Sequence, residues 1–349
     1  MSSLQKDMFK KGRLPTLGSV IEDDDDTSSP SIPSSLMTNS KKTRYVADSW
    51  DLYFDRMTHV QINSDTFCVY FLDARLEQTD KPLPVFLMHH GAGAGALSFA
   101  LVAKRIHELL NGQCVVMAMD CRGHGDTISS GELSFNVNRL SDDMVNVVSK
   151  LYPNPDPYQF ILVGHSMGGS VVVDIAYRQR LSNVMGVVVM DVVEGSALEA
   201  IQLMDKFLST RPTEFQSIEE AIQWSYKSKL VRNLQSAKVS IPPLVKLEND
   251  KYRWRTDLHL TKPYWKEWFT DLSDKFLGSP VSKLLMLAGT DRLDKTLTIA
   301  QMQGKFQLTV LMDSGHFLQE DSPDTTAATL MDFWSRFSRM VLPKPMDRI

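Results

Sequence analysis

FILVGHSMGGSVVVDIA (160–176) joins an apolar run of strand composition to a helical pattern through the string GHSMG at 164–168. Small residues on both sides of a serine permit a sharp strand-to-helix turn that exposes the serine hydroxyl. The helix that begins near Met167 then points its first amides at the same place. We therefore interpret Ser166 as a nucleophile rather than as part of a glycine-rich bend that only packs.

Apolar runs alternate with helical patterns on both sides of this stretch. This alternation predicts a mostly parallel central sheet covered by helices on both faces, which is an α/β fold. Strands are expected at 65–73, 84–90, 114–120, 160–165, 184–191, 283–289 and 307–313, and helices at 97–110, at 139–152 and from near 167.

Composition divides the 349-residue chain into segments. The N-terminal part is polar, acidic and rich in Ser and Pro, so residues 1–45 are expected to form a largely disordered tail. Residues 46–343 are expected to form the α/β domain, and residues 344–349 a C-terminal tail. Within the domain the alternation stops at 192–282, which we interpret as a helical insertion that covers the sheet as a lid.

The overall composition excludes some classes of protein. A net charge of −4 argues against a protein that coats nucleic acid. No run approaches the roughly 18 apolar residues of a membrane helix, so no membrane association is expected. The three cysteines are odd in number and lack C-x-x-C spacing, which favours reduced thiols in an intracellular protein. Cytoplasm and nucleus are not distinguished by these features.

The loop after the strand at 84–90 reads HGAGAG (90–95) and suits an oxyanion hole. In such a hole one amide belongs to the residue after the nucleophile, here Met167, and a second comes from a loop after an earlier strand. We assign the second amide to Ala92, with Gly91 or Gly93 as the next choices. The same loop also fits G-x-G-x-x-A, the pattern of a dinucleotide site, with Asp120 ending the next strand. Together with GHSMGG, the loop favours a hydrolase.

A serine nucleophile needs a histidine base and an acid, which follow it in the order serine, acid, histidine. His316 follows the last expected strand, whereas His259 lies in the insertion, so His316 is the expected base. The residues alone leave the acid open between Asp191 and the pair Asp291 and Asp294.

Neighbouring histidines such as His89 and His90 could suggest a metal site. However, no carboxylate or cysteine spacing that would complete a set of ligands accompanies them. No metal and no organic cofactor are therefore expected.

Several longer tracts resemble the protein phosphatase methylesterases. They are KGRLPTLG (11–18), VVVMDVVEGSALEAI (187–201), IEEAIQWSYKSKLVRNLQSAKVS (218–240), YRWRTDL (252–258) and LAGTDRLDKTLTIAQMQGKFQ (287–307). The resemblance implies an α/β-hydrolase fold and a serine esterase without cofactor. It implies as the reaction the removal of the methyl ester from the C-terminal leucine of the protein phosphatase 2A catalytic subunit. It also implies Asp191, in MDVVEG, as the acid beside Ser166 and His316.

A methyl ester offers little surface for recognition, so specificity is expected to come from the rest of the substrate protein. Residues 227–266 contain ten Lys or Arg against three acidic residues, which favours a basic face on the insertion. A solvated helix face would explain the same charges. The competing functions are a general small-ester carboxylesterase or lipase and a non-catalytic phosphatase-binding protein. The complete triad argues against the second, and the family tracts argue against the first.

Overall fold

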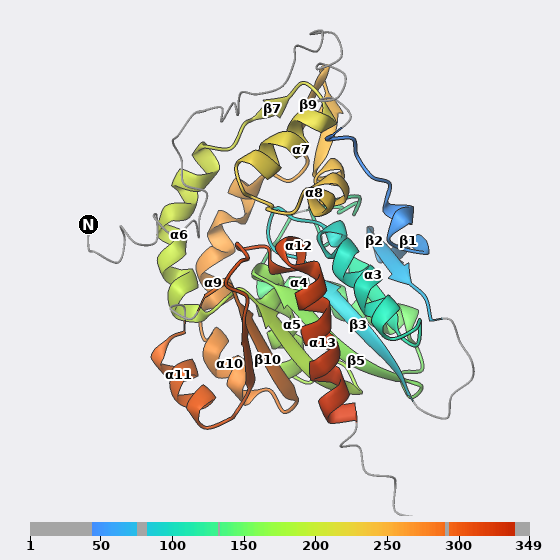
Figure 1. The fold of residues 1–349 in the computed structure, drawn as a ribbon, viewed down its shortest axis with the longest axis vertical. Helices are drawn as coiled ribbons and strands as arrows, with labels where there is room; N and C mark the ends of the chain where they lie inside the picture. Colours follow the sequence, from blue (N-terminus) through green and yellow to red (C-terminus); the bar gives the residue numbers. More distant parts are fainter. Residues whose placement is uncertain (1–43, 75–81, 132, 290–292, 339–349) are drawn as a thin grey trace, which may run out of the picture.

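The apolar runs pair side by side in an eight-stranded sheet at the centre of the computed structural model (Figure 1). The structure describes residues 44–74, 82–131, 133–289 and 293–338. The strand order is β1-β2-β4-β3-β5-β6-β10-β11. The strands are β1 (Arg56–Ile62), β2 (Asp65–Leu72), β3 (Leu83–His89), β4 (Val115–Met119), β5 (Tyr158–His165), β6 (Val184–Met190), β10 (Ser282–Leu287) and β11 (Gln307–Val310).

Only the first two pairings of this sheet, β1 with β2 and β2 with β4, are antiparallel, and all the others are parallel. The predicted mostly parallel sheet is confirmed. The edge strand β1 was not predicted, because its residues are mostly exposed or half-buried and give no apolar run.

Helices cover both faces of the sheet, as predicted. Alternate residues of β3 point to opposite faces, so Leu87 lies in one apolar cluster and Met88 in another. Met144 of α4 packs in the first cluster, and Ile106 of α3 packs with Phe333 of α13 in the second. The helices outside the insertion are α3 (Ala100–Leu109), α4 (Val137–Leu151), α5 (Met167–Tyr177), α11 (Lys295–Met302), α12 (Leu318–Asp321) and α13 (Pro323–Ser338), with short 3-10 turns at η1 (Trp50–Leu52) and η2 (Ala96–Phe99).

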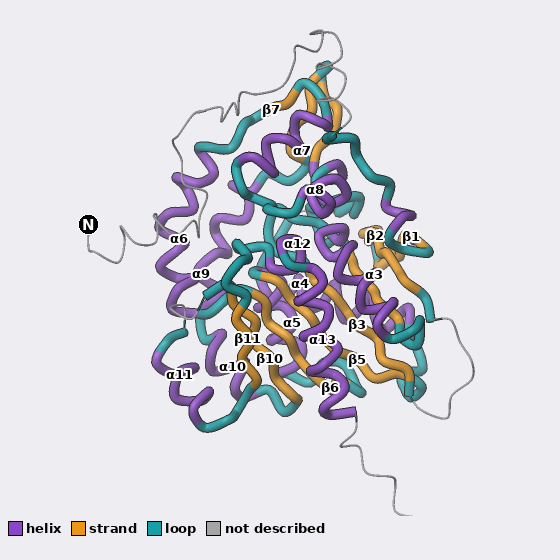
Figure 2. Tube along the Cα trace, viewed as in Figure 1, coloured by secondary structure: helices purple, strands orange, loops and turns teal. Residues whose placement is uncertain are grey.

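The segment 192–282 contains the predicted helices and also a small sheet that was not predicted. Its helices are α6 (Glu194–Ser209), α7 (Ile218–Lys227), α8 (Leu234–Ser240), α9 (Trp265–Phe269) and α10 (Leu272–Gly278), with 3-10 turns at η3 (Pro242–Leu244) and η4 (Leu258–Tyr264). Strands β7 (Glu214–Phe215), β8 (Val245–Glu248) and β9 (Lys251–Trp254) pair in the order β7-β9-β8. Figure 2 shows this sheet with α7 and α8 at one end of the molecule.

The small sheet and its helices have an apolar cluster of their own. Phe215, Ile222, Ala237 and Val245 are buried in it together with Tyr45 from the start of the described chain. These residues form a satellite apolar cluster, and Val239 of α8 also packs in the second cluster of the central sheet. A role as a lid remains a prediction.

Most of the predicted tails lie outside the described residues, which begin at 44 and end at 338. Within the described part of the chain, no helix combines the length and the apolar character needed to cross a membrane.

A buried ion network joins the start of β2 to α4 and to the loop after β4. Arg122, which is 1% exposed, donates to the carboxylates of Asp65 and Asp143 at 2.6–2.9 Å. Arg139 reaches Asp65 from the surface at 2.9 Å. Removing one member of a buried ion pair leaves its partner charged in a medium of low dielectric constant.

Arg122→Met should therefore lower the free energy of unfolding by about 3–5 kcal/mol, because two buried carboxylates lose their buried partner and keep only the half-exposed Arg139. Arg139→Met is the matched control, and its half-exposed pair should cost less than about 1 kcal/mol. Urea unfolding followed by fluorescence measures both. Equal losses of unfolding free energy in the two variants would show that the burial of Arg122 does not determine the contribution of its ion pairs to stability.

Candidate active site

Ser166 lies in a strained turn between β5 and α5. Its backbone has φ 53° and ψ −120°, a conformation that residues with a side chain rarely adopt. Glycines make this turn possible, because a Cβ on Gly164 would lie 2.2 Å from the carbonyl oxygen of Gly168. A Cβ on Gly168 would lie equally close to the carbonyl oxygen of His89. The turn therefore presents the serine at the carboxyl end of the central strands.

Asp191 and His316 form a hydrogen-bonded pair beside this turn. Asp191 follows β6, and its Oδ2 lies 2.8 Å from Nδ1 of His316. The other carboxylate oxygen, Oδ1, accepts from the amide of Ala288 at 2.8 Å. The carboxylate is fully buried, whereas the His316 side chain is 39% exposed. With Nδ1 facing Asp191, the Nε2 atom of the imidazole is the one left to exchange a proton with a serine.

In the described part of the chain, neither Ser166 Oγ nor Nε2 of His316 makes a hydrogen bond. Catalytic hydrogen bonds often form fully only when substrate is bound. The pairing of His316 with Asp191 is formed in the structure, whereas a hydrogen bond from His316 to Ser166 is not found among the described residues.

The loop that carries His316 is attached to the rest of the site by buried polar groups. Nε2 of His165 donates to the carbonyl of His316 at 2.8 Å, and the two rings lie 4.7 Å apart. Asp321 accepts from the amides of Gly315 at 2.6 Å and Arg232 at 2.7 Å. No pattern in the sequence singled out His165 for a role. Its position directly before the nucleophile was the only signal.

Buried side chains also fix the glycine-rich loop after β3. The amide of Gly93 donates to Nε2 of His124 at 2.9 Å, so Gly93 is not a free donor. The amide of Ala96 donates to Asp120 at 2.7 Å, and the amide of Ala94 to the carbonyl of Gly91. Among the described residues, the amides of Ala92 and Met167 have no acceptor. The sequence assigns these two amides to the oxyanion hole, and that role remains a prediction.

The histidines around this loop are buried, and burial holds them neutral. Desolvation lowers the pKa of His89 and of His124 to about 4, and lowers the pKa of His90 well below its usual range. Nε2 of His90 accepts from the amide of Cys121, as Nε2 of His124 does from Gly93. Among the described residues, no group of three His, Cys, Asp or Glu side chains is arranged to hold a metal ion.

The sequence also offered Asp294 and His259 as candidates for the triad and Asp120 as part of a dinucleotide site. Asp294 caps α11 through the amide of Leu297 and accepts from Ser273, so its carboxylate is used away from His316. Asp291 lies outside the described residues, and His259 lies in η4 of the insertion. The buried Asp120 accepts from two backbone amides, so its carboxylate is not free to face a ribose as a dinucleotide site would require.

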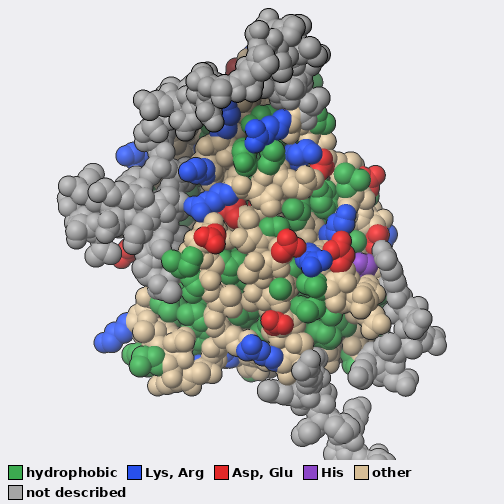
Figure 3. Space-filling model, in the orientation of Figure 1, with side chains coloured by type: hydrophobic (Ala, Val, Ile, Leu, Met, Phe, Trp, Pro, Cys, Tyr) green, Lys and Arg blue, Asp and Glu red, His purple; other side chains and the backbone are tan. Residues whose placement is uncertain are grey.

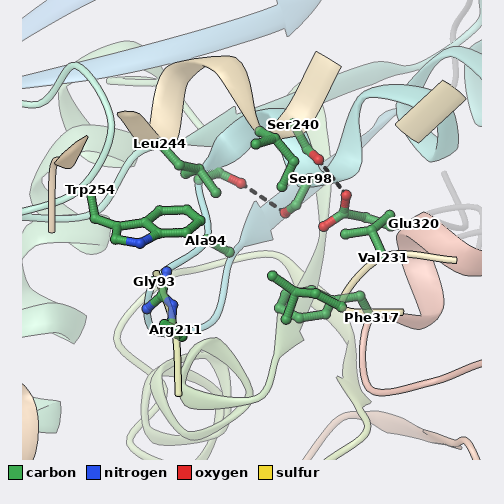
Figure 4. Close-up of a pocket in the computed structure, with 13 residues that line it drawn as sticks. Gly93, Ala94, Ser98, Arg211, Val231, Ser240, Leu244, Trp254, Phe317 and Glu320 are labelled. Carbon is green, nitrogen blue, oxygen red and sulfur yellow. Dashed lines mark hydrogen bonds between the residues drawn. The ribbon is translucent and has the colours of Figure 1, made fainter. Parts of the chain in front are cut away.

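A pocket lies between the glycine-rich loop and the insertion (Figure 4). Its apolar walls come from Leu230, Val231, Ile241, Leu244, Trp254 and Phe317. Its polar lining includes Glu320, which accepts from Ser240 Oγ, and Arg211. Burial raises the pKa of Glu320 to about 8, so this carboxyl group is mostly protonated at neutral pH. Phe317 is adjacent to His316 in the chain, so the pocket adjoins the candidate catalytic groups.

The basic character of the insertion is partly neutralised in the folded chain. Figure 3 shows Lys and Arg side chains gathered over the region of α6 and α7. However, Lys246 pairs with Glu248, Arg253 with Glu214 and Lys262 with Asp205. The charge excess in the sequence therefore overstates the free positive charge of this surface.

Comparisons with known proteins agree with the site geometry. A family model described as "Alpha/beta hydrolase family" matches residues 85–329. A protein phosphatase methylesterase 1 from Gibberella zeae is 44% identical over 314 residues, which covers 86% of this chain and 78% of the relative. The Schizosaccharomyces pombe protein of the same name is 41% identical and covers 88% and 90%.

Solved structures with low sequence identity share the fold. E-2-(acetamidomethylene)succinate hydrolase has a TM-score of 0.64 at 19% identity, and covers 80% of this chain and 99% of its own. A peroxisomal α/β-hydrolase from Saccharomyces cerevisiae has a TM-score of 0.62 at 11% identity, and covers 84% and 91%. At these identities the likeness concerns the fold alone.

His165→Leu should reduce kcat for a small ester by about 10²-fold, because loss of the Nε2–H donor lets the His316 loop move out of reach. His165→Gln keeps an amide donor and should recover part of the loss. Steady-state kinetics with a thermal unfolding control measures both. An unchanged kcat in a folded His165→Leu variant would exclude a positioning role.

Glu320→Gln should change how stability depends on pH. The raised pKa means that the folded chain keeps a proton that the unfolded chain releases above about pH 4.3. Wild-type stability should therefore fall, relative to the variant, as pH rises from about 5 to about 8. Urea unfolding at a series of pH values measures the difference, and a difference that does not vary with pH would contradict the buried protonated state.

Proposed function

We propose that this chain, which belongs to the protein phosphatase methylesterase family of α/β-hydrolases, removes the methyl ester from the C-terminal leucine of the protein phosphatase 2A catalytic subunit. Ser166, His316 and Asp191 act as its catalytic triad. The observation that carries the proposal is the 2.8 Å pair of His316 Nδ1 and Asp191 Oδ2 beside the strained turn at Ser166.

The geometry supports a separate role for each triad member. Asp191 is buried and fixes the imidazole with Nε2 directed away from the acid, so it selects the tautomer that can accept a proton. His316 is partly exposed and can reach a substrate. The proposed oxyanion donors are the amides of Met167 and Ala92, with Gly91 as the remaining neighbour in the loop.

In the proposed reaction, Nε2 of His316 takes the proton of Ser166 while Oγ bonds to the ester carbonyl carbon. The tetrahedral intermediate carries its negative charge at the amides of Met167 and Ala92. Its collapse breaks the bond to the methoxy oxygen, which takes the proton from His316 and leaves as methanol. A water molecule then attacks the acyl-enzyme and gives a proton to His316. Collapse of the second tetrahedral intermediate breaks the bond to Oγ, which takes that proton back from His316, so the leucine carboxylate and free Ser166 are released. His316 takes part in every proton transfer of this scheme.

The methyl group leaves as methanol, so the substrate must be recognised on the acyl side of the ester. The pocket between the glycine-rich loop and the insertion lies where that acyl side can enter, since His316 is followed directly by the pocket residue Phe317. A general carboxylesterase would accept small esters in the same place. The names of the relatives favour a phosphatase as the substrate.

Ser166→Ala should lower the rate of demethylation of the methylated phosphatase catalytic subunit by about 10⁴-fold or more, because the nucleophile is lost. Ser170→Ala is the matched control, since this buried hydroxyl lies one turn further along the same helix, α5. Methanol release and mass spectrometry of the C-terminal peptide measure the reaction.

The outcomes separate the competing functions. Hydrolysis of a small ester without demethylation of the phosphatase would indicate a general carboxylesterase. Binding to the phosphatase without hydrolysis of either substrate would indicate a non-catalytic partner. Equal activity of the wild type and Ser166→Ala would exclude Ser166 as the nucleophile.

A further inference from the structure

One charged side chain in the pocket has no role in the proposed triad. Arg211 follows α6 and lines the pocket together with Gly93, Ala94 and Gly95 of the glycine-rich loop. Figure 4 shows its side chain beside Gly93 and the ring of Trp254, across the pocket from Glu320. It therefore lies next to the loop that carries the proposed oxyanion amide.

The surroundings hold the guanidinium of Arg211 in a fixed orientation. Its Cζ lies 4.0 Å from the centroid of the Trp254 ring, within the range of a cation–π contact. The indole of Trp254 is itself fixed, because its Nε1 donates to the carbonyl of Pro212 at 2.8 Å. A stacked guanidinium keeps its N–H edges free to bind a planar anion.

Among the described residues, Arg211 has no carboxylate partner, whereas several other cations of the insertion have one. Within the part of the chain that the structure describes, its buried Nε has no hydrogen-bond acceptor. By contrast, Arg253 pairs with Glu214 at 3.1 Å, and Arg255 pairs with Asp126 at 2.6 Å. A buried donor without an acceptor lowers the stability of the folded protein unless a ligand supplies the acceptor.

The electrostatics of the pocket favour an anion at this position. Burial lowers the pKa of Arg211 to about 10, so the side chain still carries its charge at neutral pH. Glu320 is the acidic residue in the described lining, and it is mostly protonated because burial raises its pKa. Ser240 donates to the same carboxyl group. An entering anion therefore meets a positive charge without a matching negative one.

We propose that Arg211 binds a carboxylate of the substrate peptide, upstream of the leucine whose methyl ester is cleaved. This inference rests on the proposed function, in which the leaving group is methanol and all recognisable substrate lies on the acyl side. The apolar walls formed by Leu230, Ile241 and Leu244 receive the aliphatic part of that peptide. The bidentate geometry of guanidinium and carboxylate makes an acidic side chain the fitting ligand.

Peptides that end in leucine methyl ester test this inference. In each pair of peptides, either Asp or Asn stands at one of the four positions before the leucine. At one position, the wild type should prefer Asp over Asn by about tenfold or more in kcat/KM, mainly through KM. Arg211→Gln should abolish the preference, and Arg211→Lys should restore part of it.

Arg253→Gln is the matched control, because Arg253 is an exposed insertion cation that is already paired. It should keep the preference for Asp. Hydrolysis of a small acetate ester by every variant checks that the triad is intact.

A wild type that cleaves Asp and Asn peptides equally at every position would overturn the inference and leave the proposed function standing. Equal losses on Asp and Asn peptides in Arg211→Gln would also overturn it, since they would reveal a purely structural role. A wild type that cleaves none of the peptides would remove the proposed function together with the inference.

Discussion

The turn at Ser166 leaves no room for a side chain at Gly164 or Gly168, and the arrangement of the site depends on this turn. The backbone of Ser166 is held at a positive φ by the hydrogen bond from its amide to the carbonyl of Met190 at 3.0 Å. Asp191, the residue that follows Met190, also has a positive φ of 52°. Each such conformation costs about 1–3 kcal/mol and persists only where its surroundings enforce it. Here the parallel strands β5, β6 and β10 end side by side. Met190 of β6 accepts from the amide of Ser166 after β5, and Met286 of β10 accepts from the amide of Asp191 after β6.

The interior behind the turn contains buried polar side chains, among them the neutral histidines His90 and His124. Neutral His90 and His124 accept backbone amides of neighbouring loops, and His165 donates to the carbonyl of His316. Because the rings of His90 and His124 are desolvated, these two histidines stay neutral and keep their hydrogen-bond directions at physiological pH. The glycine-rich loop and the His316 loop are thus attached to rigid elements. The pocket beside them is lined on its other side by residues of the insertion, next to the proposed catalytic groups.

Local patterns in the sequence predicted the sheet and the strand-to-helix turn at Ser166, but they did not predict contacts between distant segments. GHSMGG, flanked by a strand and a helix, was a strong signal because the turn needs that composition. Spacing alone did not distinguish Asp191 from Asp294; the family resemblance favoured Asp191, and the structure pairs Asp191 with His316 while Asp294 caps α11. The small sheet in the insertion was missed because β7 has two residues and β8 and β9 have four each, too few for a periodic pattern. The bond from Gly93 to His124 joins residues 31 positions apart, and no local pattern reports it.

The central claim is that the buried pair of Asp191 and His316 activates Ser166. The rate at which a fluorophosphonate modifies Ser166 measures this activation without reference to any natural substrate. The account predicts one phosphonyl group per chain, on Ser166, and a rate about 10³-fold or more lower in a folded Asp191→Asn variant. Modification at another residue, or an unchanged rate in that variant, would contradict it.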